Sequence, residues 1–132
     1  MSSRLLSRGG CSFVLTLPVT PRGQERARHT QAGHTYTPAK TRAATEELRT
    51  LWMLAGSPIV PAEWFTVSIV ASLVRTKSTR LDYPAKPDVD NIAKLILDAL
   101  QGHAFKNDSR CRSLSVEKQW AERASVVVSF SW

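Results

Sequence analysis

The segment from Glu63 to Val74 limits the fold of this chain more than any other. It contains the run WFTVSIVASLV, which is rich in the β-branched and aromatic residues that favour strands. Every second residue of this run is apolar, so that one face of an extended chain would be continuously apolar: Phe65, Val67, Ile69, Ala71 and Leu73. This period of two is typical of a strand with a buried face. We therefore predict a long strand here, in the centre of a sheet.

Shorter alternating patterns predict three more strands, at residues 12–17, 114–120 and 126–132. Only a short polar turn separates the last two, so they are expected to form an antiparallel pair. Residues 19–36 are polar and without a period, and are interpreted as a long loop. Loops of this length in compact domains are usually functional or disordered.

Two helices are expected between these strands. Thr37-Pro38 is a helix-start signal and Gly56 a stop, which predicts a helix over residues 38–55. A second helix is predicted from Asp88 to Leu100, closed by Gly102. The element order β-α-β-α-β-β, without internal repeats, predicts an α+β fold in which one mixed β-sheet packs against two helices.

Length and composition support one domain. The chain has 132 residues, of which 42% are hydrophobic, enough for one core without disulfides. Residues 1–10 are expected to be a flexible basic terminus and 11–132 the folded domain. Cys11 and Cys111 form neither a disulfide framework nor a zinc-ligand spacing. No stretch reaches the roughly 18 apolar residues of a membrane span, so a cytoplasmic protein without membrane contact is expected.

The net charge of +7 favours an anionic partner such as nucleic acid or a membrane surface; the alternative is simply a soluble basic protein. Residues 1–42 contain seven Lys and Arg against one acid, Glu25, which accounts for +6 of the total. Two basic loops supply the candidate DNA-binding residues. The loop after the first strand contains Arg22, Arg26 and Arg28, and the loop after the central strand contains Arg75, Lys77, Arg80 and Lys86.

The acidic residues of the second predicted helix are the strongest chemical signal. Asp90, Lys94 and Asp98 are spaced i, i+4, i+8 and would share a strip about 80° wide, opposite an apolar face. Asp88 lies at the start of the same helix, and Asp108 is expected to fold back toward it from the following turn. Three carboxylates around one lysine would suit Mg²⁺ or Mn²⁺. Such a site supports phosphodiester hydrolysis.

Each of these residues also has a structural interpretation. Asp88 is a possible helix N-cap, and Asp90 a first-turn acid favoured by the helix dipole. Asp90, Lys94 and Asp98 would also serve as surface pairs, and Asp108 as a turn residue. Other catalytic motifs are missing from the sequence, including a phosphate-binding loop, HExxH and GxSxG. The scattered residues His29, His34 and His103 are interpreted as loop or surface histidines.

The string KPDVDNIAKLILDAL, followed by KNDSRCRSLSVEKQWAE, resembles the RusA family of Holliday junction resolvases. The N-terminal strings LPVTPRGQERARH and HTYTPAKT are similar to those of phage-type members, so the resemblance covers roughly residues 12 to 130. It implies a homodimer that binds four-way DNA junctions in recombination and repair. Such an enzyme cuts two strands symmetrically with Mg²⁺ or Mn²⁺ and uses no organic cofactor.

The resemblance also implies roles for individual residues. Asp88 and Asp90 match the paired catalytic aspartates of the family, and Lys94 matches its helix lysine. Asp108 matches an acid in the following turn, where the neighbouring Asn107 replaces a second acid found in many members. The implied metal ligands are therefore Asp88, Asp90 and Asp108, with Lys94 positioning water or stabilising the transition state. Asp98 also matches a family position, and a structural role is favoured for it.

Two other functions remain open from the sequence. One is an accessory protein that binds branched DNA without cutting it, against which the intact catalytic set argues. The other is a metal nuclease of forks, flaps or linear duplex. Restriction-type enzymes of that kind have an acid and a lysine that are separated by one residue. Glu117 and Lys118 are adjacent here, which disfavours an enzyme of this type.

Overall fold

The computed structural model describes residues 10–25, 28–29, 31–33, 35–36 and 38–132. Apart from Gly10, the expected flexible terminus therefore lies outside the described residues. The same is true of Arg26 and His34, and of the side chains of Arg28 and His29.

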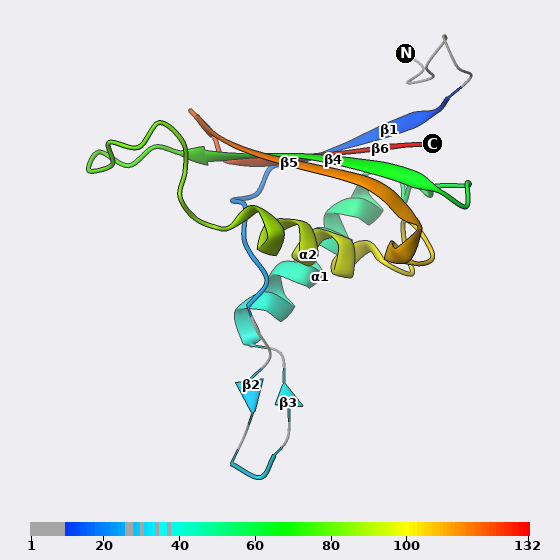
Figure 1. Ribbon diagram of the computed structural model, residues 1–132, viewed down its shortest axis with the longest axis horizontal. Helices are drawn as coiled ribbons and strands as arrows, with labels where there is room; N and C mark the ends of the chain where they lie inside the picture. The colour runs from blue at the N-terminus through cyan, green and yellow to red at the C-terminus, as the bar shows by residue number, and fades with distance from the viewer. Residues whose placement is uncertain (1–9, 26–27, 30, 34, 37) are drawn as a thin grey trace.

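A four-stranded mixed sheet forms one layer of the fold (Figure 1), in the order β1 (Ser12–Leu17), β6 (Ser125–Ser131), β4 (Phe65–Val74) and β5 (Cys111–Ala121). The prediction that the 63–74 run lies inside the sheet is confirmed. β4 pairs antiparallel with β6 and parallel with β5, so that Ile69 lies opposite both Val128 and Val116. Ile69 is fully buried.

The predicted antiparallel pairing of the last two strands is wrong, because β4 lies between β5 and β6. A β5–β6 hairpin would leave β4, the most apolar strand, with a free edge. The helix between β4 and β5 instead returns the chain to the start of the sheet, which makes these two strands parallel. Residues 122–124 then cross to the other side of β4, a step that three residues of extended chain can span.

The two predicted helices are confirmed as α1 (Ala39–Leu54) and α2 (Val89–Leu100). Both cover the same face of the sheet (Figure 1). They are joined by a hydrogen bond from the Arg49 Nε to the carbonyl oxygen of Ala99, at 2.8 Å. No helix in the described part of the chain is long and apolar enough to cross a membrane.

The segment interpreted as a long loop contains a small second sheet. β2 (Arg28–His29) and β3 (Thr35–Tyr36) pair antiparallel there. Strands of two residues are too short to show a period of two, so the sequence pattern gives no sign of them. A 3₁₀ turn, η1 (Asp108–Arg110), precedes β5.

Candidate active site

The start of α2 leaves the Asp88 carboxylate free for a ligand. Asp88 is the N-cap residue, with an extended backbone (ψ 145°), and its carbonyl oxygen accepts a hydrogen bond from the Ile92 N–H at 3.0 Å. Its exposed side chain makes no capping hydrogen bond. Asp88 is therefore at the N-cap position, as the structural interpretation predicts, but its carboxylate makes no capping hydrogen bond.

Asp90, Lys94 and Asp98 lie exposed on one strip of α2, as their spacing predicts. The opposite face is buried, with Ile92, Leu95 and Ile96 at most 2% exposed. Among the described side chains no ion pair joins Lys94 to either aspartate, although Asp90 Oδ1 accepts a hydrogen bond from the Asn91 N–H at 3.0 Å. Surface ion pairing thus does not account for this strip.

The arginine segment, which we define as residues 22–28 after β1, contacts the start of α2 through its first residues. The Gln24 N–H donates to the carbonyl oxygen of Asn91 at 3.0 Å, and the Glu25 N–H donates to Thr41 Oγ1 at 3.1 Å. A Cβ atom on Gly23 would lie 3.0 Å from the Asn91 Cβ and 3.1 Å from the Pro87 Cβ. The absence of a side chain at Gly23 therefore allows this segment to approach Pro87 and Asn91, at the start of α2, closely.

Replacing Gly23 with alanine should weaken this contact. The new methyl group meets Cβ atoms of a helix start and a proline, which move little, so we expect about 1–3 kcal/mol of lost stability. Thermal unfolding measures this loss, with Ser68→Ala, on the uncovered sheet face, as the control. An unfolding temperature equal to that of the unsubstituted protein would contradict the packing described for Gly23.

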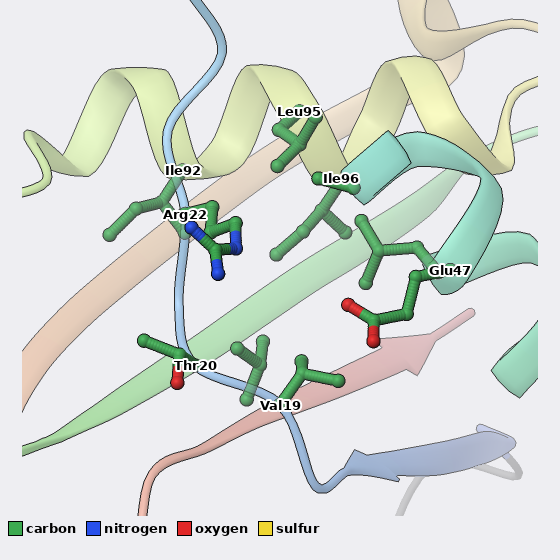
Figure 2. Close-up of a pocket in the computed structure, with 10 residues that line it drawn as sticks. Val19, Thr20, Arg22, Glu47, Ile92, Leu95 and Ile96 are labelled. Atoms are coloured by element: carbon green, nitrogen blue, oxygen red, sulfur yellow. The ribbon is translucent and has the colours of Figure 1, made fainter. Parts of the chain in front are cut away.

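A cavity of about 200 Å³ opens beside this contact. Its lining includes Arg22, Lys40, Thr41 and Pro87. Lys40 lies in the first turn of α1 and belongs to no motif, so its place in this lining could not be predicted from the sequence. A second hollow, between α1, α2 and the sheet, has Arg22 and Glu47 on opposite sides (Figure 2). Its volume of about 10 Å³ is no larger than one water molecule needs, so it is no ligand site.

The basic arm, which we define as residues 75–87, connects β4 to α2 and is fixed to β5. Lys118 Nζ donates to the carbonyl oxygen of Ala85 at 2.9 Å, and Trp120 Nε1 donates to that of Leu81 at 3.0 Å. The Arg75 guanidinium lies 5.2 Å from the centre of the Trp120 ring. The role of Lys118 in holding the arm is not apparent from the sequence pattern. One sequence feature could have drawn attention to this lysine: it follows Val116 by two residues, and so occupies a position at which the alternation of the strand predicts an apolar side chain.

Asp108 is not near Asp88 and Asp90, so the expectation that it folds back toward the helix start is wrong. Its N–H donates to Gln101 Oε1 at 2.8 Å, and Gln101 is the C-cap of α2. A helix of 12 residues separates its two ends by about 18 Å. In the described part of the chain, no three His, Cys, Asp or Glu side chains gather in a way that would hold a metal ion.

Asp108 is bordered by an open groove of about 780 Å³. Its neighbours Asn107 and Ser109 line this groove, together with the cations Lys106 and Arg110. Asn107 has a local role: its side chain accepts a hydrogen bond from the Ser109 N–H at 2.9 Å and caps η1.

The cysteine and histidine near this end have structural surroundings. Burial raises the pKa of the Cys111 thiol, which therefore stays protonated near neutral pH. The His103 ring packs edge-on against Trp52, with ring centres 5.7 Å apart. The exposed position of His103 agrees with its interpretation as a surface histidine.

The structure thus brings the start of α2, with Asp88 and Asp90, and the basic arm to one edge of the molecule, where β4 and β5 end (Figure 1). Gln24 contacts the first turn of α2 at Asn91. Comparison with protein families gives a match to the endodeoxyribonuclease RusA over residues 17–130. No individually curated protein matches the chain. The matched region begins at the last residue of β1 and contains β4, β5, nearly all of β6, both helices and every described candidate residue. The chain therefore belongs to the RusA family of endodeoxyribonucleases, which are Holliday junction resolvases.

Proposed function

We propose that this protein is a metal-dependent resolvase that cuts opposed strands of a four-way DNA junction in symmetric pairs. The observation that carries the proposal is the pair of exposed carboxylates of Asp88 and Asp90, which lie at the start of α2, where the basic arm joins the helix. An acidic site flanked by cations suits a nuclease, because the cations bind backbone phosphates while the carboxylates bind the metal.

The donor set fits Mg²⁺ or Mn²⁺. Magnesium is usually held by one or two carboxylates together with oxygen atoms of the substrate phosphates, which is what Asp88 and Asp90 can supply. When bound, the metal would provide a hydroxide nucleophile and neutralise charge on the phosphate. Lys94 lies one turn further along α2, with no ion-pair partner among the described residues. We assign it to positioning the attacking water or to stabilising the extra negative charge.

Asp108 joins this site only from a second copy of the chain. Metal–oxygen bonds are about 2 Å long, whereas the two ends of α2 are about 18 Å apart. A two-fold homodimer with antiparallel α2 helices would bring Asp108 of one protomer toward Asp88 and Asp90 of the other. The groove beside Asp108 offers room for this approach. Such a dimer also suits the approximate two-fold symmetry of a four-way junction.

Phosphate binding is assigned to the cations around the carboxylates. Arg22 is exposed at the edge, and the basic arm contributes Arg75, Lys77, Arg80 and Lys86, all exposed. Arg26 and Arg28 belong to the same proposal through their place in the arginine segment. These contacts are to the DNA backbone, and therefore independent of sequence.

Cleavage of a four-way junction, a fork and a linear duplex of the same sequence tests the proposal. We expect metal-dependent cuts at symmetric positions of the junction, mapped on labelled strands, and much slower cutting of the duplex. Equal cleavage of junction and duplex would instead indicate a general metal nuclease. Junction binding without cutting, whichever divalent metal is supplied, would indicate the accessory protein.

Replacing Lys94 with alanine should slow cleavage without weakening DNA binding. Removing one preorganised donor to a developing negative charge costs about 10²–10³ in rate, and the exposed side chain contributes little to packing. Single-turnover cleavage of a bound junction measures the rate, and gel shift measures the affinity. Arg42→Ala is the control, because Arg42 is an exposed cation of α1 that belongs neither to the site nor to the groove beside Asp108. A normal rate for Lys94→Ala would exclude the assigned role.

A further inference from the structure

Two large apolar side chains of the basic arm are exposed to solvent and do not belong to the core of the fold. Tyr83 is 68% exposed and Leu81 is 52% exposed. Among the described residues, no hydrogen bond or ring contact involves the Tyr83 side chain. Single exposed apolar residues are common on protein surfaces, so exposure by itself says little about these two.

The backbone around Tyr83 is fixed, which distinguishes it from a loop tip. The carbonyl oxygens of Leu81 and Ala85, two residues on either side of Tyr83, accept the hydrogen bonds from Trp120 and Lys118. Pro84, the next residue, is buried. The ring is therefore presented outward from an anchored backbone, and less conformational entropy is lost when it binds a ligand.

The surroundings of Tyr83 select a nucleic acid as that ligand. Residues 75–87 contain four cations and one acid, Asp82, giving a net charge of +3. Four residues lie between Tyr83 and Asp88, so the Cα atoms of these two residues are at most about 17 Å apart. A DNA strand advances 3.4 Å per nucleotide, so a base that Tyr83 contacts would lie within about five nucleotides of the phosphate at the metal site.

Within that distance a four-way junction differs from a duplex. In a continuous duplex every base face is stacked on its neighbours, whereas at a branch point stacking is interrupted and a base face is available to an inserted side chain. An aromatic ring beside cations is the arrangement that binds such a face.

We propose that Tyr83 stacks on a base at the branch point, with Leu81 packed beside it, and that this contact selects branched DNA over duplex. The proposal rests on the proposed function, since it locates the branch point near the metal site. Stacking on one base is worth about 5- to 150-fold in affinity, the equivalent of about 1–3 kcal/mol.

Binding without divalent metal tests this contact separately from cleavage. The probe is a synthetic four-way junction with 2-aminopurine at the branch point, whose fluorescence reports stacking. Affinities for this junction and for the matched duplex are compared for the unsubstituted protein, Tyr83→Ala and Tyr83→Phe. Leu54→Ala is the control, because Leu54 is 78% exposed but lies at the end of α1.

We expect Tyr83→Ala to lose the fluorescence change and at least about 5-fold of its junction affinity, with its duplex affinity unchanged. Tyr83→Phe and Leu54→Ala should behave as the unsubstituted protein. An unaltered junction affinity and fluorescence in Tyr83→Ala would overturn the contact, as would an equal loss on duplex. A Tyr83-dependent signal without any junction cleavage in Mg²⁺ would overturn the proposed function alone.

Discussion

Replacing Asp90 with asparagine is expected to abolish junction cleavage while leaving junction binding within a few-fold of the original. The amide keeps the size of the side chain and its hydrogen bond with the Asn91 N–H, but removes the charge that we propose to hold the metal. Metal stabilisation of the transition state is worth several kcal/mol. At about 1.4 kcal/mol per factor of ten, this corresponds to a loss of about 10³-fold or more in the single-turnover rate.

Asp98→Asn is the matched control, because Asp98 is an exposed carboxylate on the same strip of the same helix. Its cleavage rate should remain within about 3-fold, since two turns of helix place it about 12 Å from Asp90. Equal losses in both variants would indicate a general effect of helix charge. Wild-type cleavage by Asp90→Asn in Mg²⁺ would rule out the metal assignment.

A mixture of Asp90→Asn and Asp108→Asn protomers is expected to recover activity that neither variant has alone. If Asp108 completes the partner's site, a heterodimer has one site with both substitutions and one site with neither. Random mixing would then restore about a quarter of the sites. Because each heterodimer has one working site, its product should be a junction nicked in one strand rather than a resolved duplex pair.

The measurement uses co-refolded, differently tagged protomers, purified through both tags and assayed on end-labelled junctions. Each variant refolded with itself is the control and should remain inactive. A purified heterodimer as inactive as its parents would contradict the composite site. A chain that stays monomeric in sedimentation at assay concentrations would contradict it independently.

The local structure of this chain was predictable because the residue pattern of each helix and long strand is visible within a short stretch of sequence. β4 and α2 combine a long apolar face with clear boundary residues, and both were predicted to within two residues. The exposed strip of Asp90, Lys94 and Asp98 follows directly from helical geometry. Side-chain periodicity carries this information whatever the rest of the chain does.

The long-range arrangement was not predictable in the same way. The order of β4, β5 and β6 depends on which neighbours bury β4 best, and adjacency in sequence misled that prediction. The position of Asp108 depends on the direction of the strand after α2, which becomes clear only once β5 is parallel to β4. Lys118 was missed for a related reason, since its partner, Ala85, lies 33 residues earlier in the chain.

The anchoring of the basic arm has a consequence for synthesis of the protein. Both side chains that fix the arm belong to β5, and β6, which completes the neighbourhood of β4, is the final strand of the chain. A nascent chain that has emerged only through α2 already contains Asp88, Asp90 and Lys94, but not the residues that hold the arm beside them. This edge is therefore assembled only after β5 has been synthesised, and fragments that stop before β5 lack the two contacts that fix the arm.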